Sequence, residues 1–389
     1  MSQHKMGLGM ATIVGMNAMI GASIFTIPAM LQTSVGPAGL ITYAIVIVSV
    51  WCMAYALARV AQLYPQEGAF YVYGSAVGGH LLGSITLLSY IIGLLIAMGL
   101  LTRFTGINLH TYFPSFSPTT LGLITLWLLI ALNCVGAVLS KIGQIILIIL
   151  TLIPLLLISI LCLSKASFAS FTPFAPFGLS SIFLAIETVI FGFFGFEAIP
   201  SLFPLIQNPQ KNVPRAISLS IILTGLVYII FVGSLISALP PALFTSPDIP
   251  LAQTLLTILP HHVWLIQLIQ WAIIITIMGT IHAMSWSLGT LICSAAKRIT
   301  GKEINNRLVL VVMGLFISII CITFTSLNLF FSLTALFIVA AYGISISSLF
   351  ISAKIKKSQV LLAICGLTAA ALIFVCACAG IIGELLKKM

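Results

Sequence analysis

Charge is what this sequence has least of. Only 6% of its 389 residues are Asp, Glu, Lys or Arg, and the acidic residues number six. About a quarter of a typical globular chain is charged, so this composition excludes a soluble globular fold. The acids are scattered along the chain and form no cluster that an integral-membrane enzyme needs, so we expect no enzymatic activity. The nucleotide-binding pattern G-x-x-x-x-G-K-[ST] is also missing, which argues against a process driven by ATP.

Long apolar runs fill the sequence instead. Hydrophobic residues make up 61% of it, and the mean hydropathy is +1.25. About 20 apolar residues cross a bilayer as a helix. We therefore predict an all-α integral membrane protein with a single transmembrane domain, residues 1–389, in the cell (inner) membrane. About eleven spans are expected, at residues 7–31, 38–62, 82–112, 120–139, 142–163, 180–206, 216–239, 263–296, 308–326, 329–351 and 359–386.

The basic residues indicate how the chain crosses the membrane. The formal net charge is +10, but Lys and Arg lie in short loops rather than in one block, so no nucleic-acid partner is expected. Loops rich in Lys and Arg face the cytoplasm. With a cytoplasmic N-terminus, twelve of the sixteen basic residues fall on the inner side, and eleven spans leave the C-terminus external. The eight cysteines lie almost entirely in apolar runs, so neither a metal site nor a cofactor is expected.

The first span contains a stretch that a continuous helix tolerates poorly. Gly21, Ala22 and Ser23 are consecutive small residues, and Pro28 follows. Glycine weakens a helix, and proline lacks a backbone donor. Unpaired backbone groups at membrane depth are tolerated only where they are buried in protein or line a wet cavity. The stretch is therefore either a break that lines a binding site or a set of small residues that lets another helix approach closely.

A second interruption occurs in the sixth span. Gly192 and Gly195 are three residues apart, and the carboxylate of Glu197 follows at about mid-membrane. Spans one and six run in opposite directions, and glycine-interrupted spans at matching places in two halves indicate a transporter site built on inverted repeats. The pairing of breaks favours the binding-site interpretation of both. The expected division is a first repeat at 1–165, a second repeat at 180–352 and an extra C-terminal helix at 358–389.

Four segments carry a resemblance to a known family. Residues 19–25 (MIGASIF) resemble the break in helix one of amino acid permeases of the amino acid–polyamine–organocation superfamily. Residues 208–217 (NPQKNVPRAI) resemble the loop after helix six in that family and are the most specific of the four. Residues 64–73 and 285–289 are similar to its segments after helix two and in helix eight. The resemblance implies a LeuT-like fold: a 5+5 inverted repeat with helices 1 and 6 broken, plus trailing helices.

Three features depart from the family pattern. Ser23 stands where the first motif has its second glycine, and Ala69 stands where a second glycine follows Pro65. The fifth span also lacks the mid-helix lysine that substitutes for a sodium ion in some members.

The broken helices indicate how a free amino acid would be held. Its carboxylate would accept backbone hydrogen bonds at the positive start of the second half of helix one, beside Gly21, from Ala22, Ser23 and Ile24. By the resemblance, its ammonium group would bind the carbonyl oxygens of Met19, Ile20, Phe191 and Phe194. Neither task needs a charged side chain, which fits the small number of acids in the spans.

Three aromatic residues would set the choice of substrate. Phe191, Phe194 and Trp286 would form an apolar wall that favours a neutral or hydrophobic amino acid. A cation can also stack on such rings, so cationic amino acids stay open. For each of these residues the alternative is ordinary helix or lipid packing.

Two polar residues beside the breaks are candidates for gating or coupling. Glu197 is either a carboxylate that titrates or locks a gate, or a structural acid that accepts hydrogen bonds from backbone freed by the break. Asn17 either bonds freed backbone or joins a neighbouring helix. Glu187, nearer the outer end of the same span, is expected to be solvated or structural.

The sequence thus predicts a secondary active amino acid transporter that works by alternating access. The direction stays open among permease, exchanger and exporter. A proton or a counter-substrate would be its coupling partner, and the oligomeric state is left open. The alternatives are a cationic amino acid/polyamine antiporter and a membrane receptor that binds an amino acid without moving it.

Overall fold

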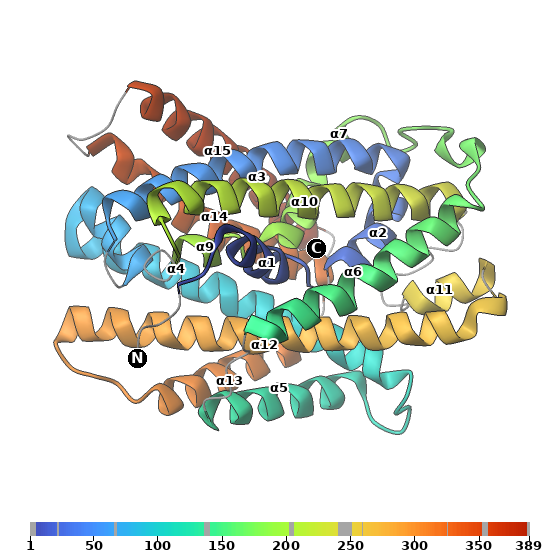
Figure 1. The fold of residues 1–389 in the computed structure, drawn as a ribbon, viewed down its shortest axis with the longest axis horizontal. Helices are drawn as coiled ribbons and strands as arrows, with labels where there is room; N and C mark the ends of the chain where they lie inside the picture. Colours follow the sequence, from blue (N-terminus) through green and yellow to red (C-terminus); the bar gives the residue numbers. More distant parts are fainter. Residues whose placement is uncertain are drawn as a thin grey trace.

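The computed structural model describes residues 5–21, 23–65, 68–135, 141–201, 206–239, 251–258, 260–324, 326–351 and 357–386. These residues form fifteen α-helices joined by 3-10 turns and loops. Within the described ranges, the β-structure is limited to one parallel bridge between Met6 and Ile206. The long helices lie side by side in one bundle (Figure 1). The fold is therefore all-α, as the sequence predicts.

The described part of the chain contains ten helices that are long and apolar enough to cross a membrane. An eleventh span results when α1 (Leu8–Met19) and α2 (Ser23–Ser34) are taken as one bent crossing. This agrees with the eleven spans expected from the apolar runs. The other spans are α3 (Gly39–Leu63), α4 (Ala69–His110), α5 (Pro118–Val135), α6 (Lys141–Leu163), the short helices within Ser180–Pro200, α10 (Pro209–Ala238), α12 (Val263–Thr300), α13 (Asn306–Thr323), α14 (Leu327–Ile351) and α15 (Lys357–Leu386).

Helix α4 begins earlier than the apolar run predicts. The expected span starts at residue 82, whereas the helix starts at Ala69 and is 42 residues long. Gly78 and Gly79 interrupt it with non-helical backbone angles, and the φ of Gly79 is +68°, a value that favours glycine. Gly83 lies so close to Ser75 that a Cβ on Gly83 would overlap its hydroxyl. The segment before the two glycines therefore folds back on the membrane-crossing part, which an apolar run alone does not reveal.

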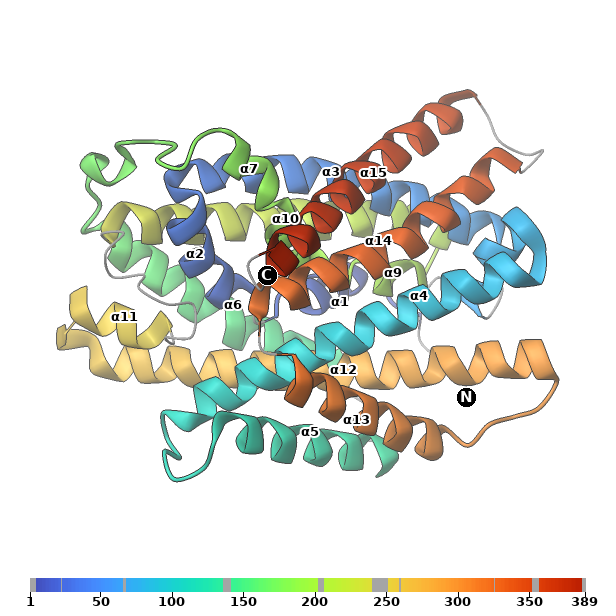
Figure 2. The ribbon, with the colours of Figure 1, turned by 180° about the vertical axis from the view of Figure 1, so that it is seen from behind.

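The broken helices lie inside the bundle. Helix α14 packs against both α4 and α15, and α3 packs against α10 and α15. Figure 2 shows α4, α14 and α15 on the side that faces away in Figure 1. Helix α1 contacts α10 and α6, while the segment of span six contacts α3, α14 and α15. The described residues on either side of both interruptions are thus surrounded by other helices.

Basic side chains mark one end of the bundle. Arg59 lies near the end of α3, Arg215 near the start of α10 and Arg298 near the end of α12. The amide of Gln62 donates to the Gln210 carbonyl at 3.2 Å, which ties α3 to α10 at this end. We call it the basic end; it lies at the left of Figure 1, and α11 (Leu251–Ile258) lies at the opposite end.

Candidate functional site

The first span is broken where the small residues predict it. Helix α1 ends at Met19, and the last helical bond runs from the Ile20 N–H to the Met16 carbonyl at 2.7 Å. Helix α2 starts at Ser23, and the two helices are bent by 49°. Ala22 lies outside the described residues, so its predicted backbone contact stays a prediction. Gly21 sits against α12, because a Cβ on it would lie 3.3 Å from Thr280 Oγ1.

The sixth span is broken over a longer stretch. Helix α8 (Ile186–Ile190) passes into the 3-10 turn η3 (Phe191–Phe193), and α9 (Ala198–Ser201) resumes after it. Phe194 is extended, and Gly195 has a φ of +114°, a left-handed value that favours glycine. A Cβ on Gly195 would also overlap the carbonyl of Ala18. The second break therefore rests directly on the backbone of α1.

A tyrosine joins the two breaks. The hydroxyl of Tyr228, on α10, lies 3.1 Å from the Met19 carbonyl oxygen and 2.9 Å from the Gly192 carbonyl oxygen. It therefore shares its proton between backbone groups that the two interruptions leave without helical partners. Sequence reasoning missed this residue, because a tyrosine inside an apolar helix carries no pattern that separates it from ordinary core aromatics.

Ser23 lies between the breaks. Its side chain is 2% exposed, and its hydroxyl lies near that of Tyr228 but has no described partner in hydrogen-bond geometry. A Cβ on Gly192 would lie 3.2 Å from Ser23 Oγ, so the hydroxyl faces the opposite break. Buried polar groups are normally hydrogen-bonded. An unpartnered hydroxyl at the start of α2, where backbone N–H groups are also free of helical partners, is the kind of group that a polar ligand satisfies.

Glu197 is held by three groups around it. Its carboxylate accepts the Gly195 N–H at 2.9 Å and the Tyr90 hydroxyl at 3.0 Å, and the Tyr342 side chain also faces it. The Phe70 ring stacks on Tyr90 with ring centroids 4.0 Å apart. Glu197 thus has the structural role of binding backbone freed by the break. A role in gating or coupling stays a prediction.

Asn17 reaches a neighbouring helix. Its amide nitrogen lies 2.7 Å from the Gln144 carbonyl oxygen and 2.7 Å from Gln144 Oε1, at the start of α6. Of the two roles considered for Asn17, the structure shows the contact with another helix. Gln144 was not singled out from the sequence, because a single amide near the end of an apolar span is common.

The structure brings two of the three aromatic candidates together. The Phe191 and Phe194 rings meet edge to face at 6.3 Å, and Phe191 also packs on Phe331 of α14 at 4.9 Å. Both candidates are buried beside the second break. Trp286, on α12, has a side chain that is 37% exposed and is not part of this ring cluster. Its place in the substrate wall stays a prediction.

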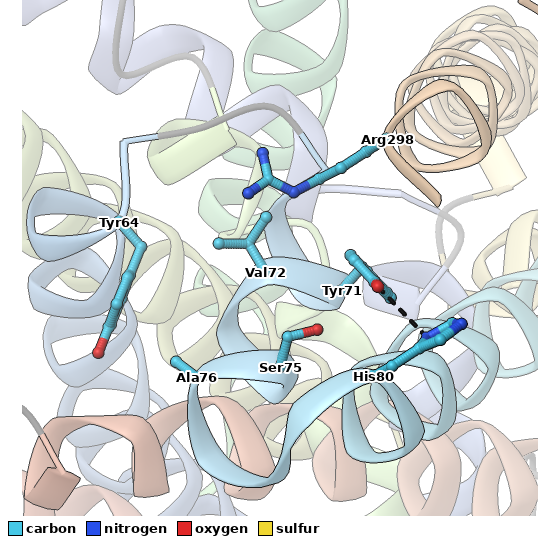
Figure 3. Close-up of a pocket in the computed structure, with 7 residues that line it drawn as sticks. All are labelled: Tyr64, Tyr71, Val72, Ser75, Ala76, His80 and Arg298. Atoms are coloured by element: carbon cyan, nitrogen blue, oxygen red, sulfur yellow. Dashed lines mark hydrogen bonds between the residues drawn. The ribbon is translucent and has the colours of Figure 1, made fainter. Parts of the chain in front are cut away.

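A separate hollow opens at the basic end. Figure 3 shows this cavity of about 370 Å³, where the Tyr71 hydroxyl lies 3.3 Å from His80 Nδ1 and the Arg298 guanidinium lies over Val72. Nearby, Lys297 pairs with Glu303 at 2.6 Å, and this contact lowers the pKa of the exposed Glu303 carboxyl. The cavity is lined by residues of the α3–α4 connection, α4 and α12, and it does not include the residues of either break.

No metal centre is evident in the ranges that the structure describes. They contain no group of three or more His, Cys, Asp or Glu side chains placed to hold an ion. The groups at the breaks are backbone amides, carbonyls, hydroxyls, aromatic rings and the Glu197 carboxylate.

The fold and the paired breaks define a class of membrane transporter. A solved structure of a Na⁺-coupled sialic acid symporter, in a substrate-bound outward-open state, matches this chain with a TM-score of 0.63. The match covers 96% of this chain and 90% of the other, at 15% sequence identity. The symporter has the LeuT fold, and the described helices share it.

Sequence comparison then identifies the family. A sequence model of the family described as "Amino acid permease" matches residues 7–383, so the chain belongs to the amino acid permease family. It is 24% identical over 287 residues to an uncharacterized transporter of Mycobacterium tuberculosis (strain ATCC 25618 / H37Rv), covering 72% of this chain and 63% of that protein. It is also 24% identical over 279 residues to the branched-chain amino acid permease BcaP of Bacillus subtilis (strain 168), covering 65% and 59%.

These comparisons confirm the resemblance and set its limits. The chain aligns with less than two thirds of the length of either relative. The family and the fold are those of transporters, and the described helices make this a multi-pass membrane protein.

Proposed function

We propose that this protein is a secondary active transporter that moves a neutral or hydrophobic amino acid by alternating access. The observation that carries the proposal is the meeting of two unwound segments inside the bundle. Tyr228 joins their carbonyl groups, and the unpartnered hydroxyl of Ser23 lies between them. A free amino acid carries one anionic and one cationic group, and paired half-helices offer a donor end and an acceptor end to such a molecule.

The substrate would lie across the two breaks. Its carboxylate would face the start of α2, where the N–H groups of Ser23 and Ile24 and the Ser23 hydroxyl are donors. Its ammonium group would face the C-terminal ends of α1 and η3. The Met19 carbonyl already accepts one hydrogen bond from Tyr228, but a carbonyl oxygen has a second lone pair for the ligand.

The side-chain pocket would be apolar. Phe191 and Phe194 lie on one side of the breaks, and Ile24 and Phe25 follow Ser23 in the buried first turns of α2. One relative is named a branched-chain amino acid permease, which supports an aliphatic substrate. The Glu197 carboxylate at the second break already binds Gly195 and Tyr90.

The basic end would face the cytoplasm of the cell. Arg59, Arg215 and Arg298 lie there, and Lys and Arg are enriched in cytoplasmic loops. Helix α2 and the start of α14 would then face outward, and the C-terminus would be external.

Filling the space between the breaks tests the site. The purified protein is placed in liposomes loaded with unlabelled amino acid, and counterflow of radiolabelled leucine, methionine, phenylalanine or arginine is measured. We expect Ser23→Trp to abolish counterflow, because the indole occupies the volume between Ser23 and Gly192. Leu223→Trp is the matched control, since Leu223 is 43% exposed on the outside of α10.

The outcome separates the site from the function. Undiminished counterflow in Ser23→Trp means that substrate does not pass between the breaks. Wild-type protein that binds an amino acid but shows no counterflow for any of them is a receptor, and the transport proposal then fails.

A further inference from the structure

A carboxylate is buried next to the C-terminal helix, far from the basic end. Glu187 lies on α8, one turn before Phe191, and its side chain is 6% exposed. It reaches α15 at Gly380, where a Cβ would overlap both carboxylate oxygens. The absence of a side chain at Gly380 therefore makes a notch that the Glu187 carboxylate fills. Glu187 is not solvated, contrary to one of the two roles expected from the sequence.

A second carboxylate lies one turn further along α15. Glu384 accepts the Ser326 hydroxyl at 2.8 Å and the Asn328 amide at 3.1 Å, both at the start of α14. Figure 2 shows the end of α15, near the C label, crossing the start of α14. Ser332, one turn after Asn328, faces Glu187, and the two carboxylates are close enough to repel each other. Glu187 and Glu384 therefore contact successive turns of α14, at Ser332 and at Asn328.

The elements packed around Glu187 bring no basic side chain to it. Helices α2, α7 (Ser180–Leu184) and α14 and the turn η3 contain no Lys, Arg or His. On α3 the basic residue is Arg59, which bonds Gln62 at the basic end, and Tyr43 stacks on Tyr228. On α15 the ionisable groups that face Glu187 are Cys376 and Glu384. Lys387 and Lys388 lie outside the described residues.

One oxygen of Glu187 lacks a donor. Its Oε2 atom is buried and makes no hydrogen bond to the described residues. A buried charged acceptor without a donor is costly, and so is a second negative charge close by. One proton on Glu187 removes both costs. A metal ion would need more ligands, and the described residues contain no group of three or more His, Cys, Asp or Glu side chains placed to hold one.

We propose that Glu187 and Glu384 form a proton-binding site, and that proton exchange there is coupled to the movement of α8 during transport. Helix α8 leads directly into Phe191, whose ring packs on Phe331 beside Ser332. A protonated Glu187 fits the apolar notch at Gly380 and holds α8 against α14 and α15. Loss of the proton places a charge in that notch and favours displacement of α8. The inference rests on the proposed transport function and assigns its coupling ion.

Proton movement per substrate tests the site directly. Proteoliposomes with a trapped pH-sensitive dye report proton flux, and radiolabelled substrate reports transport in the same sample. We expect substrate-driven proton flux in the wild type. Glu187→Gln is expected to lower the ratio of proton flux to substrate flux at least tenfold and to flatten the dependence of uptake on external pH. Gly380→Ala, which displaces the carboxylate, is expected to change the same ratio. Glu303→Gln, on the exposed loop after α12, is the matched control and is expected to keep the wild-type ratio.

The other outcomes overturn the inference. If Glu187→Gln and Gly380→Ala both transport with the wild-type ratio and pH profile, the pair is structural. If uptake follows a sodium gradient at constant pH and Glu187→Gln removes that dependence, the site binds sodium. Counterflow at symmetrical pH is measured in parallel. If the wild type shows counterflow but no proton flux, only proton coupling is rejected. If the wild type shows no counterflow, the transport function itself is rejected. If Glu187→Gln does not elute as a single folded species, Glu384→Gln takes its place in the same assay.

Discussion

Replacing Tyr228 with phenylalanine removes one hydroxyl from the centre of the molecule and leaves the ring in place. That hydroxyl lies 3.1 Å from the Met19 carbonyl oxygen and 2.9 Å from the Gly192 carbonyl oxygen. Both carbonyls are buried at breaks, so the variant leaves them without this donor. A buried polar group that loses its partner costs about 1–3 kcal/mol. Interhelical hydrogen bonds in membranes average about 0.6 kcal/mol and reach about 1.7 kcal/mol.

We therefore expect Tyr228→Phe to destabilise the arrangement of the two breaks by about 1–2 kcal/mol. An effect of this size changes an equilibrium constant about 5- to 30-fold. If substrate binds where the breaks meet, its half-saturating concentration should rise by a similar factor. The measurement is the initial rate of uptake into proteoliposomes over a range of substrate concentrations, together with the thermal unfolding midpoint in detergent.

Tyr43→Phe is a matched control in the same cluster. The Tyr43 ring lies 6.0 Å from that of Tyr228, edge to face, but its buried hydroxyl makes no hydrogen bond to the described residues. Removing this hydroxyl should be neutral or slightly stabilising. Equal effects of the two substitutions would refute the reasoning, since the ring and not the hydroxyl would then matter. If Tyr228→Phe lowers the unfolding midpoint but leaves uptake unchanged, the Tyr228 hydrogen bonds stabilise the fold without contributing to substrate binding.

Two further substitutions test the breaks themselves. Gly195→Ala should lower the thermal unfolding midpoint more than Gly301→Ala. Both glycines have a positive φ, and the backbone strain of an alanine there costs about 1–3 kcal/mol, but only Gly195 also lies against another backbone. Asn17→Ala should reduce stability by about 0.5–2 kcal/mol and Gln144→Ala by less, because Asn17 bonds the Gln144 backbone carbonyl as well as its side chain, and Gln144→Ala keeps the backbone bond. The double variant should cost little more than Asn17→Ala alone; additive losses in chemical or thermal unfolding would mean that the two side chains act independently.

Much of the fold could be predicted because the bilayer imposes a simple rule. A run of about 20 apolar residues is a span, and the apolar runs matched the helices in number. The start of α4 could not be predicted in this way. Its first turns fold back through Gly78 and Gly79, and this depends on close packing rather than on hydrophobicity.

The breaks could be located from local chemistry, whereas their partners could not. Clustered small residues weaken a helix wherever they occur, so Gly21 and Gly195 are visible in the sequence. Tyr228, Tyr90 and Tyr342 come from helices distant in the chain, and their roles arise only when those helices meet.

The two interruptions are attached to different neighbours. The first is linked to α6 through Asn17 and lies on α12 at Gly21, whereas the second is linked to α4 and α14 through Glu197. Tyr228, on α10, bonds both of them. Any rocking of one group of helices past the other must therefore stretch one of the two Tyr228 bonds or carry α10 along with the moving group. In the second case the two groups of helices would rotate relative to each other about the hydroxyl oxygen of Tyr228.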